Sequence, residues 1–267
     1  MSADRTQDWN PGTYNRFRDL RLRPAQDLIA RIGALPAGPV VDLGCGNGAV
    51  ATALAARFAG RALIGVDRSP AMLAEAAAVG AFSALVEANV VDWHPDAPPA
   101  LIFSNAALHW LDDHATLMPR LADMLQPGGV LAVQMPNQFD APSHALLRQV
   151  AQELFPGRVT DPAAWATPVG APPDYARMLG ASGEVDAWKT TYVQRLAPVA
   201  TAHPVRRFTE STAMRPFLAA LDPDEAARFV SAYEAELAGA YPAEDDGSVL
   251  FPFRRLFFTL TRTGAAS

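Results

Sequence analysis

The feature that most restricts the fold of this chain is a glycine-rich segment that directly follows a short apolar run. Val40–Leu43 has the composition of a buried strand, and Gly44, Gly46 and Gly48 follow it at alternate positions. Glycines at this spacing let the chain turn sharply from a strand into a helix and let a ligand contact the backbone. Such a turn lies at the carboxyl end of a strand, where open α/β sheets bind their ligands.

The rest of the chain alternates between apolar runs and segments with helical spacing of apolar residues. Strands separated by helices form parallel sheets with right-handed crossovers. We therefore predict an α/β fold: a Rossmann-like, seven-stranded, mostly parallel sheet with helices on both faces and a helical lid inserted between the last two strands. The predicted strands span residues 40–43, 62–66, 82–87, 101–104, 130–135, 184–195 and 249–263.

The predicted lid follows from a long segment between the last two strands. Helices are expected there over 197–207, 210–220 and 223–240, and a segment of this length is too long to be a loop. A further expected helix begins after Asp112-Asp113, which we interpret as a helix cap and not as a metal site. The predicted organisation is an N-terminal cap segment (1–30), a core (31–195), the helical insertion (196–245) and a closing strand of the core (246–267).

Two cofactors are compatible with the glycine loop. Gly44-x-Gly46-x-x-Ala49, with Asp67 about 20 residues further on, satisfies a loose dinucleotide fingerprint. S-adenosylmethionine is the alternative, and Asp42 favours it. A carboxylate two residues before the first glycine would repel a pyrophosphate, whereas it would stabilise the cationic sulfonium and amino groups of S-adenosylmethionine. A tight turn with no ligand is the remaining interpretation.

Polar residues at the ends of the next strands fit the same cofactor. Asp67 is expected to accept the ribose hydroxyls, Asn89 to bind the adenine amine, and Asn105 to lie beside the methionine part. Asp67 could instead be a charge at a helix start, and Asn89 a turn residue. The full predicted cofactor set is Asp42, Gly44, Cys45, Gly46, Gly48, Asp67, Arg68, Asn89, Val90 and Asn105.

Motifs across nearly the whole chain resemble those of one enzyme family. They include Trp-Asn-Pro at 9–11, Gln-Met-Pro at 134–136 and Arg-Leu-Phe at 255–257, in addition to the glycine loop. With them the chain resembles the class I S-adenosylmethionine-dependent methyltransferases, and among these the trans-aconitate 2-methyltransferase family. The resemblance implies methyl transfer to a carboxylate of trans-aconitate, giving a monomethyl ester and S-adenosylhomocysteine.

A carboxylate acceptor needs positioning more than activation. Its pKa lies near ~4, so it is already ionised at neutral pH and needs no general base. We therefore expect no catalytic residue beyond positioning groups, and no metal. A substrate with three carboxylates needs cations and polar walls around the two that do not react. The predicted substrate contacts are Tyr14, His109, Trp110, Tyr192, Arg215 and Arg255. Packing is the alternative for the three other aromatic residues and surface pairing for the two arginines, whereas His109 is expected to be a hydrogen-bonding wall and not an acid or base.

Other functions remain open at this point. The acceptor could be another acid, such as a malonyl group on a carrier protein or an acidic natural product, or the chain could bind S-adenosylmethionine without catalysis. A dinucleotide oxidoreductase is a further alternative. The 28 acidic and 22 basic residues give a formal net charge of -6, which argues against nucleic-acid binding. With one cysteine, a polar start and no apolar run of ~18–20 residues, we expect a cytoplasmic monomer without a membrane partner.

Overall fold

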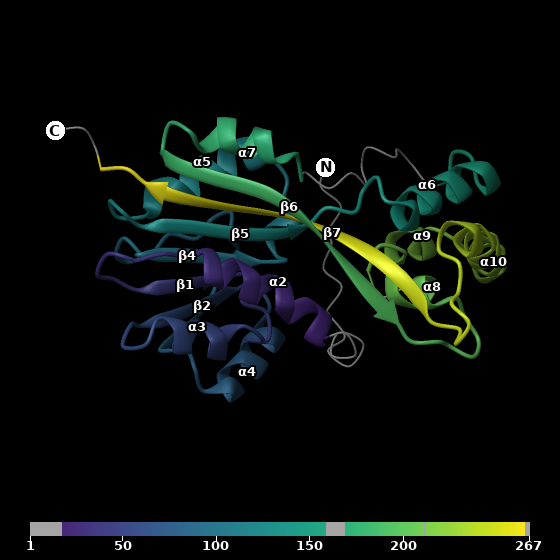
Figure 1. Cartoon of the computed structure of the whole chain (residues 1–267), viewed down its shortest axis with the longest axis horizontal. Coiled ribbons are helices and arrows are strands. Elements are labelled where there is room, and N and C mark those ends of the chain that lie inside the picture. Colours follow the sequence, from purple (N-terminus) through teal and green to yellow (C-terminus); the bar gives the residue numbers. More distant parts are fainter. Residues whose placement is uncertain (1–17, 159–168, 211, 265–267) are drawn as a thin grey trace. The chain divides into compact units, whose positions relative to one another are not determined.

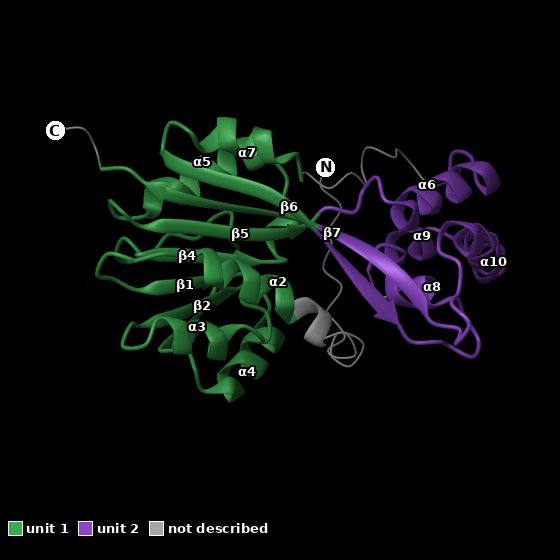
Figure 2. Cartoon of the chain, in the orientation of Figure 1, with its two compact units in different colours: residues 1–136, 168–190, 255–267 green, residues 137–167, 191–254 purple. Residues whose placement is uncertain are grey.

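A computed structural model of the chain describes residues 18–158, 169–210 and 212–264. The chain divides into two compact units (Figure 2). Unit 1 comprises residues 1–136, 168–190 and 255–267, and unit 2 comprises residues 137–167 and 191–254. The divisions at 190/191 and 254/255 fall inside the two long strands β6 (Gly183–Leu196) and β7 (Val249–Arg262).

The sheet confirms the predicted seven-stranded, mostly parallel architecture (Figure 1). Its order is β3-β2-β1-β4-β5-β7-β6. The first five strands pair in parallel, and β7 runs antiparallel to β5. The bounds of these five are β1 Val40–Leu43, β2 Leu63–Asp67, β3 Ala84–Glu87, β4 Leu101–Asn105 and β5 Val130–Pro136.

Local sequence signals explain where the helices of unit 1 begin and end. The Ser69 hydroxyl accepts a hydrogen bond from Met72 N, proline occupies the first turn of the following helix, and Gly80 ends it in the left-handed conformation. Asp113 caps the helix after it by accepting from Thr116 N at 3.2 Å, as the cap interpretation predicted. The helices are α2 Arg18–Arg31, α3 Ala51–Arg57, α4 Pro70–Val79, the 3-10 turn η1 Leu108–Trp110, α5 His114–Met124 and α7 Pro172–Leu179.

The two faces of the sheet are covered by different helices. On one face, α5 and α7 pack on a cluster of buried aliphatic residues, and Tyr175 of α7 stacks on Phe258 with ring centroids 5.0 Å apart. On the other face α2 contacts β5, Trp188 stacks on Phe257, and the Arg31 guanidinium lies 5.1 Å from the Trp188 ring centroid. This second face includes Asp42, so its polar residues bear on the functional site.

In its described residues, unit 2 consists of four helices and of residues 191–196 and 249–254 of the two long strands. The helices are α6 Pro142–Leu154, α8 Pro204–Glu210, α9 Arg215–Ala219 and α10 Pro223–Ala240. The expected helix 197–207 begins later than predicted, at Pro204, because proline suits a first helical turn and disfavours helix in the residue before it. His203 Nδ1 accepts from Val205 N at this start.

The predicted insertion and the observed unit 2 overlap without coinciding. Helices α8, α9 and α10 lie within 196–245, as expected, but unit 2 also includes α6 and begins at residue 137. The α6 helix packs on α10, and the Tyr233 hydroxyl of α10 donates to the Ser143 carbonyl of α6 at 2.7 Å. Whether these helices act as a lid stays a prediction. None of the helices in the described residues is long and apolar enough to cross a membrane.

Candidate functional site: the carboxyl edge of the sheet

The glycine loop joins β1 to α3, and its three glycines differ in how closely other atoms approach them. All three have positive φ: 75° at Gly44, 53° at Gly46 and 75° at Gly48. A Cβ at Gly44 would lie 2.3 Å from the Ala107 Cβ, and one at Gly48 would lie 3.1 Å from Phe82. At Gly46 a Cβ would meet nothing within 4 Å. Gly44 and Gly48 therefore permit close packing, whereas Gly46 leaves open space beside the backbone.

Two buried oxygen atoms near this loop have no hydrogen-bond partner among the described residues. Asp42 is 3% exposed and its Oδ2 is unpartnered. Asn105, at the end of β4, is half-buried, and its buried Oδ1 is also unpartnered. Asp42 pairs with Phe103 in the parallel register, so Asp42 and Asn105 lie on the same face of adjacent strands. Burial, and to a lesser degree the negative charge of Asp67, raise the pKa of Asp42 to about 7. Both oxygens can accept hydrogen bonds from a cationic donor.

Asp67 ends β2 and is held by the loop. Its Oδ2 accepts from Gly46 N at 2.8 Å, and its Oδ1 accepts from Ser69 N at 2.9 Å. Each carboxylate oxygen has a second lone pair, so both can still accept from a ligand. Arg68 beside it is exposed. Cys45 is buried, and burial raises the pKa of its thiol far above the ordinary value, so Cys45 is an apolar wall of the loop and not a nucleophile.

Asn89 and Val90 follow β3. Asn89 is exposed, and its Oδ1 accepts from Val91 N at 3.2 Å, while its carbonyl accepts from Asp92 N and Trp93 N. This is the bonding of a turn residue. Its side-chain amide nitrogen takes no part in that turn, and Val90 is 9% exposed. The adenine role of the pair stays a prediction.

A second polar group lies where β4, β5 and β7 are neighbours. Arg255 is 3% exposed, and its Nη1 donates to Gln134 Oε1 at 3.2 Å. Gln134 pairs with Asn105 of β4 on one side, and Arg255 pairs with Pro136, two residues further along β5, on the other. His109 lies in the turn after β4, and its Nδ1 is buried without a hydrogen-bond partner among the described residues.

The charge in this second group resides on Arg255. The pKa of His109 is lowered to about 3, chiefly by burial and further by the charges of Arg255 and His114. The imidazole is therefore neutral at physiological pH. Trp110 packs beside it with ring centroids 4.6 Å apart and is 44% exposed. The backbone turns into this segment at Ala106, whose φ is 54°, a conformation that costs energy for a side chain and is frequent at functional sites.

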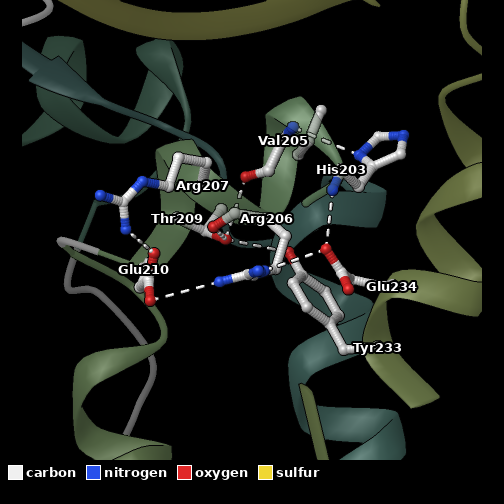
Figure 3. A network of polar contacts seen from close by, with 8 residues as sticks. All are labelled: His203, Val205, Arg206, Arg207, Thr209, Glu210, Tyr233 and Glu234. Atoms are coloured by element: carbon white, nitrogen blue, oxygen red, sulfur yellow. Dashed lines mark hydrogen bonds and ion pairs between the residues drawn. The ribbon is translucent and has the colours of Figure 1, made fainter. Parts of the chain in front are cut away.

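Two predicted substrate residues belong to unit 2. Tyr192 (7% exposed) and Arg215, the half-buried first residue of α9, are part of unit 2. Around Arg215, the chain is tied to α8 by Met214 N and Thr212 N, which both donate to the Thr209 carbonyl. The α8 helix is in turn held by a network around Arg206 and Tyr233 (Figure 3). Tyr14 lies outside the described residues.

The strand register thus places the predicted residues Asp42, Asn105 and Arg255 on one face of the sheet in unit 1, and the turn after β4 carries His109. The register adds Gln134, which the sequence analysis did not assign. A signal was available, because Gln134 is the polar residue in an otherwise apolar strand, Val-Leu-Ala-Val-Gln-Met-Pro. Chemically, the edge offers two acceptors for a cation next to the glycine loop, and one buried cation with neutral polar neighbours for an anion.

Comparisons with known proteins agree over nearly the whole chain. A family profile described as a methyltransferase domain matches residues 14–166. A trans-aconitate 2-methyltransferase of Methylobacterium nodulans is 46% identical over 258 residues, covering 96% of this chain and 99% of the relative. Proteins of the same name from Klebsiella pneumoniae and Escherichia coli are 42% and 38% identical, covering 94% and 96% of this chain and 96% and 99% of theirs.

Solved structures share the fold at much lower identity. The YcgJ protein of Bacillus subtilis has a TM-score of 0.56 at 15% identity, covering 91% of this chain and all of that one. A Haemonchus contortus phosphoethanolamine N-methyltransferase solved with S-adenosylmethionine has a TM-score of 0.53 at 17% identity, covering 91% of this chain and 53% of that one. At such identity the likeness concerns the fold alone.

Proposed function

The chain belongs to the trans-aconitate 2-methyltransferase family of S-adenosylmethionine-dependent enzymes, and from this membership we infer that it methylates one carboxylate of trans-aconitate. The products are the monomethyl ester and S-adenosylhomocysteine. The observation that supports this most is the identity of 38–46% to relatives of that name, which extends through both units and not merely through the sheet. A shared cofactor-binding half alone would not specify the acceptor.

The residues of the edge fit S-adenosylmethionine, whose sulfonium supplies the methyl group when it is bound. Asp42 Oδ2 and Asn105 Oδ1 are buried acceptors suited to the cationic end of the cofactor. The open space at Gly46 allows its backbone to be approached closely, and Asp67 adjoins that space with lone pairs for ribose hydroxyls. We assign Gly44, Cys45, Gly48 and Arg68 to the wall of this site, and Asn89 and Val90 to the adenine end.

The acceptor needs no base from the protein. All three carboxylates of trans-aconitate are ionised at neutral pH, so a carboxylate oxygen attacks the methyl carbon directly. The task of the protein is to place that oxygen in line with the breaking carbon–sulfur bond and to exclude water. The positive and negative charges cancel as the methyl group moves, so a buried, dry edge favours the reaction.

Arg255 and His109 are the proposed substrate contacts in unit 1. A guanidinium grips a carboxylate with two parallel hydrogen bonds, and at 3% exposure Arg255 is shielded from competing water. The neutral His109 can add one hydrogen bond without adding charge. Trp110, and in unit 2 Tyr192 and Arg215, stay predictions as further contacts, as does Tyr14.

We also propose that the enzyme acts in the cytoplasm as a monomer on a free small molecule, with no nucleic-acid or membrane partner. The net charge of -6 supports the absence of a nucleic-acid partner. Light scattering coupled to gel filtration measures the mass directly, and a peak near twice 28.5 kDa would contradict the monomer.

The test is an assay of S-adenosylhomocysteine release with trans-aconitate, cis-aconitate, citrate, isocitrate and malonate in parallel. Mass spectrometry of the product should show one added methyl group, and base hydrolysis should remove it as an ester. Selective turnover of trans-aconitate is the expected result. Turnover of another acid in its place, or none of any acid despite a thermal shift by S-adenosylmethionine, would overturn the proposal.

A further inference from the structure

The side-chain amide of Gln134 has an oxygen and a nitrogen, and among the described residues only the oxygen has a hydrogen-bond partner. Its side chain is fully buried, and one atom of its amide lies 3.2 Å from Arg255 Nη1. A guanidinium has donors and no acceptor, so the atom facing it must be the amide oxygen. That fixes the orientation of the amide, and it leaves the nitrogen, with its two N–H groups, as the other end. Nε2 has no hydrogen-bond partner among the described residues.

The surroundings of Gln134 Nε2 indicate what kind of ligand group it can bind. A buried amide nitrogen without a partner is unfavourable, and a bound water, an ion or a ligand can supply the missing acceptor. The ligand atom must be an acceptor, because Nε2 only donates. The neighbouring charge is the cation of Arg255, and the nearby His109 is neutral at physiological pH. An acceptor next to a single buried cation is best supplied by an anion of one unit charge.

We propose that Gln134 and Arg255 form a two-residue clamp for one non-reacting carboxylate of the substrate, with Gln134 as a specificity-determining residue. This proposal rests on the proposed function, since it takes the substrate to be a polycarboxylate. In the clamp, the Gln134 oxygen orients the guanidinium through the bond to Nη1, and the Gln134 nitrogen donates to the carboxylate beside it. The single charge of the clamp suits one carboxylate and not two.

The test uses Gln134→Glu, which changes one amide nitrogen to oxygen at nearly constant shape. The variant keeps an acceptor for Arg255, but it removes the donor and neutralises the guanidinium. We expect the KM for trans-aconitate to rise about 10- to 100-fold, the loss of one or two hydrogen bonds to a charged group. The KM for S-adenosylmethionine should change less, because the substitution leaves the cofactor residues in place, including Asn105, which pairs with Gln134 in the neighbouring strand. Gln134→Met, which buries no charge, should raise the KM in the same direction.

Gln138→Glu is the matched control. Gln138 is also buried, at 3% exposure, but both ends of its amide are used by backbone groups: Nε2 donates to the Pro252 carbonyl at 3.3 Å, and Oε1 accepts from Arg254 N at 2.9 Å. The same substitution there should lower the melting temperature and leave the KM for trans-aconitate within about threefold. A general effect of a buried carboxylate would move both variants alike.

Three dicarboxylates show which carboxylate the clamp binds. Itaconate, mesaconate and glutaconate each equal trans-aconitate without one of its carboxyl groups. In the wild type the analogue that lacks the clamped carboxylate should be disfavoured against trans-aconitate, and this preference should vanish in Gln134→Glu. The clamp would be overturned if Gln134→Glu raised the KM for all four acids equally, or if it raised only the KM for S-adenosylmethionine.

Binding measured by calorimetry separates this proposal from the proposed function. The dissociation constant of trans-aconitate is measured on the complex of the enzyme with S-adenosylhomocysteine. Weaker binding in Gln134→Glu supports the clamp even if the wild type shows no turnover, in which case the proposed reaction fails and the clamp does not. Unchanged binding in the variant, or no binding to the wild type, would overturn the clamp directly.

Discussion

The carboxyl edge of the sheet in unit 1 and the α8–α10 network in unit 2 both bury polar side chains, but they differ in how these are partnered. In unit 2, Arg206 contacts Glu234 at 3.0 Å and Glu210 at 3.3 Å, and the Tyr233 hydroxyl contacts Thr209 (Figure 3). The same hydroxyl also donates to the Ser143 carbonyl. At the edge in unit 1, polar atoms of Asp42, Asn105, His109 and Gln134 have no partner among the described residues.

The difference separates a structural network from a binding site. Buried polar groups that satisfy one another specify the packing of helices, and their loss is felt as lower stability. Buried polar groups that lack a hydrogen-bond partner lower the stability of the free protein, and a ligand can supply that partner. Substitutions in the first region should therefore change the free energy of unfolding, and those in the second should change ligand binding.

Arg255→Met should have the largest effect on activity. Removing a buried cation that holds a substrate carboxylate costs about 2–5 kcal/mol in binding, so kcat/KM for trans-aconitate should fall by about 30- to 5,000-fold. Steady-state kinetics measure this. Arg262→Met is the control on the same strand, because Arg262 donates to the Asp123 and Leu125 carbonyls at the opposite edge of the sheet. Equal losses in both variants would count against the assignment.

Arg206→Met should show the opposite pattern. It leaves the partly buried Glu234 without its guanidinium and Glu210 with Arg207 alone, and we expect a loss of about 2 kcal/mol in the free energy of unfolding. Chemical denaturation measures it. Arg177→Met removes an exposed pair with Asp174 and should cost less than about 0.5 kcal/mol. The affinity for S-adenosylmethionine should be unchanged in both variants. A large decrease in either would contradict the purely structural role of the unit 2 network.

Asp42 should make both stability and cofactor binding depend on pH. Its pKa is raised in the folded state to about 7 from an ordinary 3.8, so the folded protein holds a proton that the unfolded chain has lost. The contribution of Asp42 to stability is therefore present below pH ~4 and is lost as pH rises toward 7. Cofactor binding should favour the ionised form and weaken by up to about tenfold per pH unit below 7.

Asp42→Asn tests these two slopes. Without a titrating group, the variant should lose the decrease in stability between pH 4 and 7 and should bind S-adenosylmethionine weakly at every pH. Thermal denaturation and calorimetry across pH 5–8 provide both measurements. A wild-type affinity that does not change with pH would contradict the role of the carboxylate.

Gly46→Ala should have the smallest effect, and Gly60→Ala provides a matched substitution of another glycine with positive φ. The φ of 53° at Gly46 makes a side chain cost about 1 kcal/mol in stability, and Gly60→Ala, at φ 82° and also in open space, should cost about the same. Only Gly46→Ala should weaken S-adenosylmethionine binding, by about tenfold. Isothermal titration distinguishes them, and equal affinities would place the cofactor away from Gly46.

Much of the fold could be predicted because its signals are local. The Val40–Leu43 strand, the glycine turn and the Ser69-Pro70 helix start each depend on a few adjacent residues, and the structure has them where expected. The helix expected from 197 was wrong in its start, because the preference set by Pro204 outweighed an apolar periodicity. The division between the units lies inside two continuous strands, where no composition change marks it.

At the site, the chemistry of single positions could be predicted from the sequence: an acid before the first glycine, polar residues at strand ends and an arginine in an apolar strand. Tertiary structure decided which of them meet. Gln134 faces Arg255 because β7 returns antiparallel beside β5, and Asn105 lies next to Gln134 through the β4–β5 register. Whether a buried polar atom finds a partner depends on neighbours from distant strands. Local sequence cannot specify those neighbours, because long-range pairing alone brings them together.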